Sequence, residues 1–521
     1  MTTPSSPLVL EPSGWLGNDG NWSTFRITVG EPAQTFDVLP AFGHGEVWLP
    51  VPDGCKPYAR MPFDCASSRG VVAASAPCSS GFETNLSSSW DLLGIYDLNT
   101  DLFVGNETGL YGLDTVSLLP GMSIQKQAVA GITTSDFWLG QIGIAQTQEM
   151  YYLLDGPATM TNGLVASLSN YTPSVSFGYT AGASYVSSKG SLVLGGYDQA
   201  RLTGQALILP LNRSNQSPLS VDVVDIVAAN TMSGTISTPL GHTGLPVYID
   251  AGVSQMWLPR TICDLFAEAF GLIYDSDEEI YLINSTAHAL LAMDEPQLTF
   301  TFAARPPYTG TVNIVLPYAA LALPISQPYY NETAMYFPLR RAKTRSVLGQ
   351  AFLQEAYLIV DWERNNLTLG QVAHEGNATQ DIVPILPTPT GPPARAIGGS
   401  AVIGMATGCI GVVITIFLAV LFKYKRLRRG PQDDVPEHGK PEVTSGLVME
   451  PRNRTIKQAV EQCDDNEVDQ DFMAGPGCHE LPSEPVVSML MSTPVYELPG
   501  GRIEYELSSQ EPTCQPDCGP N

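Results

Sequence analysis

The stretch from Ala41 to Pro50 reads AFGHGEVWLP, and the stretch from Asp250 to Pro259, 209 positions later, reads DAGVSQMWLP. Both copies hold a glycine, an aliphatic residue and a final Trp-Leu-Pro in the same frame. Such a repeat is typical of a duplicated two-lobed fold in which one loop from each half meets at a shared centre. A carboxylate leads only the second copy, so chemistry that needs two acids finds one. The shared positions that we expect to frame the loops are Gly43, Trp48, Gly252 and Trp257.

The composition predicts an all-β body. The chain has 521 residues, 44% of them hydrophobic, with 48 glycines and 42 prolines. Short alternating or apolar runs between turn residues predict strands at 25–29, 191–194 and 357–360. The clearest helical pattern covers 261–270. We expect an N-terminal β lobe over 14–205 and a C-terminal β lobe over 206–383.

An uncharged stretch of 26 residues, 397–422, is rich in Val, Ile, Leu, Ala and Gly. As a helix rising ~1.5 Å per residue it would exceed the ~30 Å hydrocarbon core of a bilayer. A basic cluster follows it and favours the cytoplasmic side of the membrane; its members are Lys423, Lys425, Arg426, Arg428 and Arg429. The sequence therefore predicts a single-pass type I membrane protein whose body is extracellular or lumenal, at the cell surface or in the vacuole.

Two further segments flank the predicted span. Residues 384–396 are rich in proline and predict a semi-stiff juxtamembrane linker. Residues 423–521 predict a disordered cytoplasmic tail, because beyond residue 429 they hold 18 acidic and 5 basic residues and little apolar content. Residues 1–15 lack the basic and apolar segments of a signal peptide. Either the sequence begins downstream of the true start, or the span serves as a signal-anchor.

Sequons and cysteines agree with this orientation. One N-x-S/T sequon, at Asn453, follows the span, whereas ten precede it and are candidate glycosylation sites: Asn21, Asn85, Asn106, Asn170, Asn212, Asn215, Asn284, Asn331, Asn366 and Asn377. Four cysteines also precede it, an even number that suits two disulfides in an oxidising compartment: Cys55, Cys65, Cys78 and Cys263. Three pairings are open, and Cys55 joined to either Cys65 or Cys78 would close a surface loop.

Charge and histidine content exclude other classes of protein. The net charge of −26 argues against a nucleic-acid partner, since nucleic-acid-binding domains are basic. The six histidines are scattered without metal-ligand spacing, so we expect neither a metal nor a cofactor.

Four further motifs lie in order along the body: Gln34 to Ala41, Tyr111 to Val116, Leu194 to Asp198 with Thr203-Gly204, and Val347 to Leu353 with Tyr357 to Asp361. Together with the two loops they resemble the pepsin-like aspartic peptidases (peptidase family A1), especially membrane-anchored fungal members, over roughly residues 20–375. The resemblance implies a two-lobed all-β fold. It also implies that 111–116 follows the flap, that 194–204 closes the first lobe, and that the last motif is the final strand pair.

In this family each lobe supplies an Asp-Thr/Ser-Gly loop, and the two acids share one proton because like charges at ~3 Å cannot both ionise. Asp250 occupies the second position, but Ala41 occupies the first. Three side chains are candidates for the missing acid. Asp37 lies four residues earlier on the same strand, roughly 13 Å away; Glu46 is expected to point to the surface; His44 is expected to be a polar loop residue.

Other departures also fall at the reaction centre. Phe42 and Ala251 stand where the family has hydroxyl residues that lock the loops together, and Gln350 replaces an Asp. An ungapped count puts Leu102 at the position of the flap tyrosine, with Tyr96 as an alternative. Several losses at one centre, beside intact framework positions, indicate a retained fold and a lost reaction.

We therefore predict a non-catalytic aspartic-peptidase homologue that binds peptides or glycopeptides in its interlobe cleft. One helix ties it to the membrane, and its tail is available to cytosolic partners. Three alternatives stay open. An active acid endopeptidase would show acid-dependent cleavage lost in Asp250→Ala. A cell-surface sensor or receptor would show tail-dependent partners, and a structural glycosylated stalk would show neither.

Overall fold

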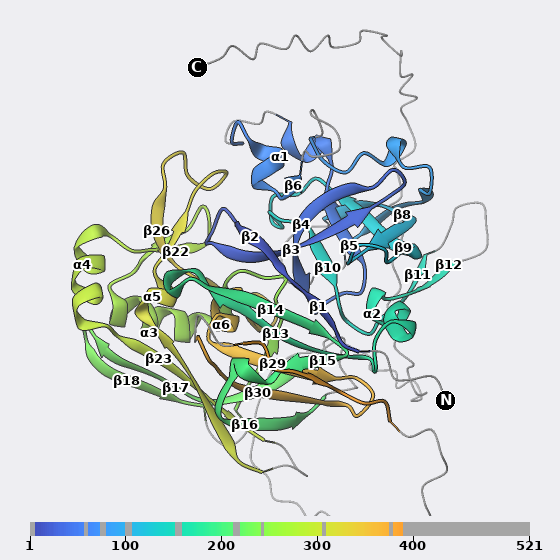
Figure 1. Ribbon diagram of the computed structural model, residues 1–521. Coiled ribbons are helices and arrows are strands. Elements are labelled where there is room, and N and C mark those ends of the chain that lie inside the picture. The colour runs from blue at the N-terminus through green and yellow to red at the C-terminus, as the bar shows by residue number, and fades with distance from the viewer. Residues whose placement is uncertain are drawn as a thin grey trace, which may run out of the picture. The chain divides into compact units, whose positions relative to one another are not determined.

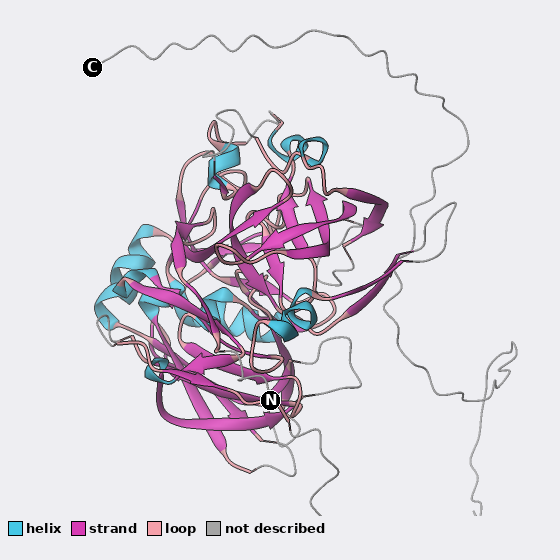
Figure 2. Cartoon of the chain, turned by 45° about the vertical axis from the view of Figure 1, so that its right-hand side comes forward, coloured by secondary structure: helices cyan, strands magenta, loops and turns pink. Residues whose placement is uncertain are grey.

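The computed structural model describes residues 6–388, except for 57–60, 73–79, 99–106, 152–158, 212–218, 241–243, 305–308 and 375–378. The described residues belong to one unit that ends at Thr388. Strands dominate it (Figure 2). The three predicted strands and the predicted helix all lie within elements of the expected type. The prediction of a mostly β body is confirmed.

The first half of the chain builds a nine-stranded sheet, drawn from blue to cyan in Figure 1. In sheet order its strands are β2 (Pro12–Leu16), β3 (Trp22–Val29), β4 (Gln34–Ala41), β10 (Gln141–Gly143), β5 (Val47–Pro50), β9 (Ile124–Ile132), β8 (Thr108–Ser117) and β7 (Asp91–Asp97), with β6 (Val71–Val72) beside β4. The last six residues of β4 are buried. A strand covered on both faces in this way can deliver its final residue, Ala41, to the molecular interior.

The second half builds an eight-stranded and a four-stranded sheet. The larger contains β24 (Thr311–Pro317), β23 (Gln297–Ala303), β17 (Ser220–Thr231), β19 (Leu245–Ile249), β28 (Ser346–Leu348), β20 (Met256–Leu258) and β27 (Leu339–Arg341), with β18 (Gly234–Pro239) beside β17. The smaller contains β21 (Ile273–Asp275), β22 (Ile280–Leu282), β26 (Ala334–Phe337) and β25 (Leu323–Ile325).

The same three-strand arrangement occurs in both halves. In the first, β10 lies between β4 and β5, parallel to β4 with Gly143 opposite Ala41, and antiparallel to β5. In the second, β28 lies between β19 and β20 in the same two senses, with Leu348 opposite Ile249. Each copy of the repeated sequence is therefore a loop between two strands that a third strand, distant in sequence, holds apart.

A six-stranded sheet joins the two halves and lies between them in Figure 1. Its strands are β1 (Leu8–Leu10), β14 (Ser188–Leu194), β13 (Ser176–Ala183), β29 (Ala356–Asp361), β30 (Asn366–Val372) and β16 (Leu202–Pro210). The end of the second half thus pairs with the first, since Phe177 lies opposite Val360. Apolar residues of both halves form one continuous core. The boundary predicted at 205/206 falls inside β16.

The longest helix, α3 (Arg260–Phe270), follows directly on the second loop. Its buried residues Ile262, Phe266 and Phe270 recur every fourth position, which places them on one face. Gly271, at φ +63°, ends the helix in the left-handed conformation that glycine adopts without strain. The other helices are α1 (Cys65–Ser68), α2 (Leu164–Ser167), α4 (Ser285–Asp294), α5 (Tyr318–Leu321) and α6 (Gln350–Leu353). Two strand pairs complete the described body: β11 (Gln148–Tyr151) with β12 (Thr159–Asn162), and β15 (Gly196–Asp198) with β31 (Ile382–Pro384).

One of the two predicted disulfides is present. One of the cysteines expected to form the other is a free thiol. Cys55 and Cys65 are bonded and close a loop beside α1. Cys263 is a free, buried thiol on α3, so the expectation that it forms a disulfide is wrong. Its Sγ lies 3.3 Å from the carbonyl oxygen of Leu258 and 3.4 Å from that of Arg340. Cys78 lies outside the described residues.

The sequons that can be located are mostly at the surface. Asn21, Asn85, Asn170, Asn284 and Asn331 are exposed, and Asn366, on β30, is half-buried. The other four sequons before the predicted span, at Asn106, Asn212, Asn215 and Asn377, lie outside the described residues. Glycosylation at these sites stays a prediction.

The folded body extends to Thr388, beyond the end predicted at residue 383. Thr388 donates from its backbone N–H and its hydroxyl to a Glu363 oxygen at 2.8 and 3.2 Å, and Arg364 donates to the Leu386 carbonyl at 2.9 Å. The first residues of the predicted linker are thus bound to the body. The remaining linker, the span at 397–422 and the tail lie outside the described residues. None of the helices described up to Thr388 is long and apolar enough to cross a membrane.

Candidate functional site

The two repeated loops meet, as their sequences predict. The Asp250 Oδ1 atom accepts hydrogen bonds from the backbone N–H of Gly252 in its own loop at 2.9 Å and of Phe42 in the opposite loop at 2.7 Å. A Cβ added to Gly43 would lie 2.6 Å from the Asp250 Oδ2, so only glycine permits this approach. A Cβ added to Gly252 would lie 2.9 Å from the Cβ of Ala41. The carboxyl group of Asp250 therefore bridges the two halves next to Ala41.

Asp250 titrates without a carboxyl partner among the described residues. Burial raises its pKa, and the opposing influences are the backbone N–H groups of Phe42, Gly252 and Gly43 and the charge of Arg345. Ala41 is fully buried and offers no proton donor or acceptor in its side chain. A shared-proton pair needs two close carboxyl groups. This centre supplies one buried carboxyl group that is surrounded by backbone N–H groups.

Two of the three candidate replacement groups are held elsewhere. Asp37 forms two hydrogen bonds with Arg26, opposite it on β3, both at 2.9 Å. Glu46 does not point to the surface as expected: it is buried, and one of its oxygens accepts from the Tyr151 hydroxyl at 2.9 Å. The expectation fails because β11 brings Tyr151 over the loop, a long-range contact that the local sequence does not reveal.

His44, the third candidate, is a mostly buried structural residue, with 12% of its side chain exposed, rather than a simple polar loop residue. Its ring stacks on Trp48 with centroids 3.7 Å apart and planes 5° apart, and its Nε2 lies 2.9 Å from the Gln141 Oε1. Because Oε1 can only accept, Nε2 carries the hydrogen. Burial lowers the pKa of His44 to about 4. Above that value the imidazole is neutral, and its Nε2 cannot act as a base.

Two glutamine side chains bind the loops, which lack the hydroxyl groups expected from the family at Phe42 and Ala251. Gln141, on β10, donates from Nε2 to the Gly252 carbonyl at 2.8 Å and so crosses between the halves. Gln350, at the start of α6, donates to the Ala251 carbonyl at 2.7 Å and accepts from the Tyr179 hydroxyl at 3.0 Å. Sequence reasoning marked Gln350 only as a departure and did not single out Gln141. The loops are thus fastened by side-chain amides.

Phe42 explains why a hydroxyl is absent from the first loop. Its ring lies 5.1 Å from that of Phe177 and packs edge-on against Tyr179 at 5.5 Å, both on the central sheet. An aromatic side chain at this position buries apolar area where a hydroxyl would need a partner. The substitution therefore belongs to a consistently apolar environment.

Two buried acidic residues, Glu46 and Glu149, interact with each other near the first loop. Glu46 and Glu149 are both buried, and burial raises the pKa of each; their mutual repulsion raises the pKa of Glu149 further, to about 8. At least one of them is therefore protonated at neutral pH. Tyr96, the alternative flap tyrosine, is buried on β7 with its ring against Tyr111 and Tyr151, at 5.8 and 5.2 Å. Leu102 lies outside the described residues.

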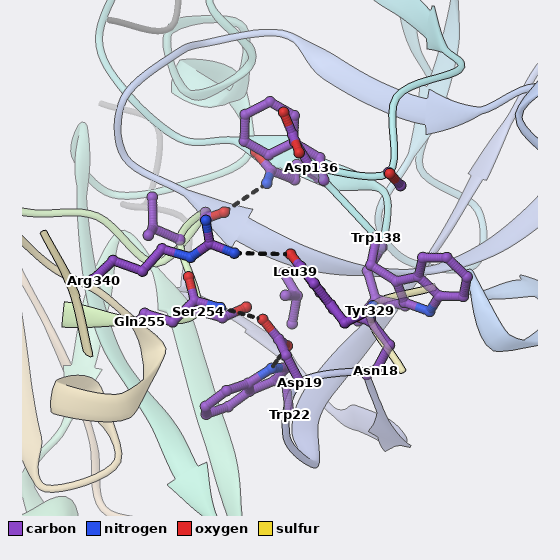
Figure 3. Close-up of a pocket in the computed structure, with 17 residues that line it drawn as sticks. Asn18, Asp19, Trp22, Leu39, Asp136, Trp138, Ser254, Gln255, Tyr329 and Arg340 are labelled. Carbon is purple, nitrogen blue, oxygen red and sulfur yellow. Dashed lines mark hydrogen bonds between the residues drawn. The ribbon is translucent and has the colours of Figure 1, made fainter. Parts of the chain in front are cut away.

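A polar pocket lies between the halves beside these loops (Figure 3). From the first half, Asp19 enters with its oxygens bonded to Trp22 Nε1 at 2.8 Å and to Gln255 Nε2 at 2.6 Å. Arg340 and Tyr329 enter from the second half, and Gln141 and Gly252 connect the pocket to the loops. Sequence reasoning did not find it, because residues 252–255 of the second loop form it only together with Asp19, Tyr329 and Arg340, which come from segments outside the motifs.

A model of the eukaryotic aspartyl protease family matches residues 24–372. The chain belongs to this family. The match spans both loops and most of the described body, so the pepsin-like identity of the fold expected from the sequence motifs is confirmed.

Curated relatives agree. The chain is 26% identical over 361 residues to "Secreted aspartic protease 8" of Candida albicans, covering 69% of this chain and 78% of that one. It is 24% identical over 371 residues to "Candidapepsin" of Candida tropicalis, covering 70% and 82%. It is also 24% identical over 413 residues to "Probable aspartic-type endopeptidase OPSB" of Arthroderma benhamiae, covering 76% and 78%.

The site as a whole is a family framework with altered chemistry. Trp48 and Trp257 are almost fully buried behind their loops, and Gly43 and Gly252 permit the close approach of the loops. Among the described residues, no three His, Cys, Asp or Glu side chains gather where a metal ion could be held. What remains is an interlobe cleft with one buried acid and amide crosslinks.

Proposed function

We propose that this aspartic-peptidase homologue binds peptides between its two lobes without cleaving them, and that one helix at 397–422 anchors it in a membrane. The observation that carries the proposal is that no second carboxyl group lies beside Asp250 among the described residues. Hydrolysis without a metal or covalent nucleophile needs one group to activate water and another to protonate the intermediate. Ala41 supplies neither.

The hydrogen bonds around Asp250 support a structural role for its side chain. Its Oδ1 accepts from Phe42 and Gly252, so that oxygen is engaged by the fold itself. The neighbouring His44 is neutral above a pKa of about 4 and carries its Nε2 hydrogen toward Gln141. These contacts support a retained binding cleft over a lost reaction.

The names of the relatives support the opposite candidate, an active acid endopeptidase. The deciding experiment measures cleavage of a denatured protein substrate between pH 3 and 6 by the wild type, Asp250→Ala and Ala41→Asp. We expect no cleavage by the wild type. Cleavage by Ala41→Asp alone would show that this side chain is what the reaction lacks.

The controls separate folding from chemistry. Each variant is first checked for a cooperative melting transition, and Asp277→Ala, which changes an exposed carboxylate, serves as the matched surface variant. Acid-dependent cleavage by the wild type that disappears in Asp250→Ala would refute the non-catalytic proposal. The search would then turn to an unrecognised second proton donor.

The membrane part of the proposal rests on the apolar stretch, the basic cluster that follows it, and the larger number of sequons before this stretch than after it. We expect glycosidase treatment of the cell-derived protein to reduce its mass, and an antibody against the tail to reach its epitope only after permeabilisation. Removing 397–429 should release the body into the soluble fraction. A tail epitope exposed on intact cells would contradict the orientation.

A further inference from the structure

Arg340, on β27, is a buried cation with unused hydrogen-bonding capacity at the interlobe pocket. It is 7% exposed, and its guanidinium lies 5.5 Å from the Trp257 ring centre and 5.7 Å from that of Tyr329. One nitrogen, Nη2, donates to the Tyr329 hydroxyl at 3.3 Å. Its Nε is buried and finds no acceptor within the part of the chain that the structure describes. Figure 3 shows the guanidinium reaching into the pocket.

The pocket carboxyl groups do not satisfy this cation. The two oxygens of Asp19 are each bonded to a neutral donor, Trp22 and Gln255. Arg340 forms no ion pair with any carboxylate in the described ranges. Burying a charge without a partner is costly. Asp19 and Asp136, which line the same pocket, attract Arg340 electrostatically, but neither forms an ion pair with it.

Other arginines of the same chain show that the fold can satisfy such groups. Arg69 is fully buried and donates to four backbone carbonyls, those of Gly54, Thr134, Phe137 and Trp138. Arg341, the neighbour of Arg340, donates to Asp264 and to the Tyr281 hydroxyl, both at 2.9 Å. Arg340 differs from both because its Nε finds no acceptor among the described residues and its side chain lines a pocket.

We propose that Arg340 binds the carboxylate of an acidic residue in the peptide that occupies the cleft. The inference rests on the proposed function, since it names the ligand class of the same cleft. A guanidinium binds a carboxylate through charge-assisted hydrogen bonds that are about twice as strong as neutral ones. The Trp257 and Tyr329 rings hold the guanidinium in place, so little conformational entropy is lost when the ligand binds.

The pH dependence of this binding follows from the groups that face Arg340. Burial raises the pKa of both Asp19 and Asp136; Glu107 and Glu279 raise that of Asp136 further, and Lys343 opposes them. Tyr329, whose pKa is raised to about 12 and which also interacts with Glu278, stays neutral. Arg340 lowers the pKa of both aspartates, but the net shift of each is upward, so each binds its proton at a higher pH than an ordinary aspartate. Protonation removes a negative charge that competes with the ligand carboxylate for Arg340. The affinity for an acidic peptide should therefore rise as the pH is lowered from 7 toward 5, where a ligand carboxyl with pKa ~4 is still mostly ionised.

The test uses the full chain in mild detergent and fluorescein-labelled ten-residue peptides. In each peptide pool one position is fixed as Glu or as Gln, and the others are an equal mixture of Ala, Leu, Phe, Ser and Thr. Fluorescence anisotropy at pH 5 and 7 gives the affinities. At one fixed position we expect Glu pools to bind about tenfold more tightly than Gln pools, with a larger ratio at pH 5.

Variants assign the preference to Arg340. Arg340→Gln should abolish the Glu preference, and Arg340→Lys should keep part of it. Arg260→Gln, which removes the same charge from a side chain 73% exposed on α3, should leave it intact. The wild-type comparison decides the question even if Arg340→Gln does not fold.

Three outcomes would overturn the inference. Equal binding of Glu and Gln pools by the wild type would refute it while leaving peptide binding in place. A Glu preference that survives in Arg340→Gln would assign the selectivity to another group. Absence of binding by every pool would refute the proposed function together with this inference.

Discussion

At the scale of single residues, the Asp250 carboxyl group is a structural contact between the two halves. Its Oδ1 accepts backbone N–H groups from both halves, Gly252 at 2.9 Å and Phe42 at 2.7 Å. Buried donors of this kind need acceptors whether or not any reaction takes place. The fold therefore has its own reason to keep this carboxyl group, although Ala41 provides no second one.

Replacing Asp250 should consequently destabilise the protein. Asp250→Ala leaves two buried N–H groups without an acceptor, at ~1–3 kcal/mol each, so we expect a loss of roughly 2–6 kcal/mol in the free energy of unfolding. Asp250→Asn keeps an acceptor oxygen and should lose less. Urea unfolding at pH 7 measures both, with Asp277→Ala as the exposed control. An Asp250→Ala protein as stable as the wild type would refute the structural role.

The residues of the centre were predictable to different degrees. Ala41, Gly43, Asp250 and Gly252 could be located because the duplicated sequence carries them in one frame. Gln141, which fastens the loops, could not, since its function depends on the placement of β10 beside β4. The sequence records that a glutamine is present but not which strand lies next to it.

The burial of polar side chains in the first loop was mispredicted for the same reason. Glu46 and His44 are polar residues in a glycine-rich loop, where exposure is the ordinary expectation. Glu46 is buried and His44 is mostly buried, because the Tyr151 hydroxyl on β11 bonds to Glu46 and the Trp48 ring on β5 stacks on His44. Contacts between distant strands set the environment of a polar side chain, and local composition carries no sign of them.

At the scale of elements, hydrophobic periodicity and turn residues were sufficient to predict single strands and α3, but not how these elements assemble. The helix over Arg260–Phe270 has apolar residues at helical spacing and a terminal glycine. The central sheet is different, because β29 and β30 pair with β13 and β16 from the other half. The lobe boundary predicted from the linear order therefore falls within β16. A sheet shared by two halves has no signature in either half alone.

The buried cysteine makes the same point. The even number of cysteines before the predicted span suggested two disulfides, and the Cys55–Cys65 disulfide is present. Cys263 belongs instead to the apolar face of α3 beside Phe266, where a thiol packs as a small apolar group. Helical periodicity, rather than cysteine counting, was the informative signal at that position.

At the scale of the whole molecule, buried carboxyl groups make stability depend on pH. Burial raises the pKa of Asp19, Glu46, Asp136, Glu149 and Asp250. A carboxyl group whose folded pKa is raised contributes stability that is fully present below its unfolded pKa and is lost as the pH rises through the folded value. For Glu149 this interval runs from 4.5 to about 8. These groups favour a fold that is more stable in acid.

His44 acts in the opposite direction and limits that trend. Its folded pKa is lowered from 6.5 to about 4, so the unfolded chain binds a proton first as the pH falls. Its contribution to stability is present above 6.5 and is lost between 6.5 and 4. Below pH 6.5 this loss offsets part of the gain from the carboxyl groups.

We therefore expect the melting temperature to rise by several degrees from pH 8.5 to pH 6.5 and to level off below. Glu149→Gln removes an ionisation that the fold opposes, so it should raise the melting temperature at pH 8.5 and have little effect at pH 5. Glu363 provides the contrast, because hydrogen bonds from Thr388 and Val175 lower its pKa; Glu363→Gln should destabilise at pH 8.5. Melting curves of the three proteins between pH 5 and 8.5 measure this. A wild type more stable at pH 8.5 than at 6.5, or a Glu149→Gln protein without a gain at pH 8.5, would show that the buried acids do not control the stability of this fold.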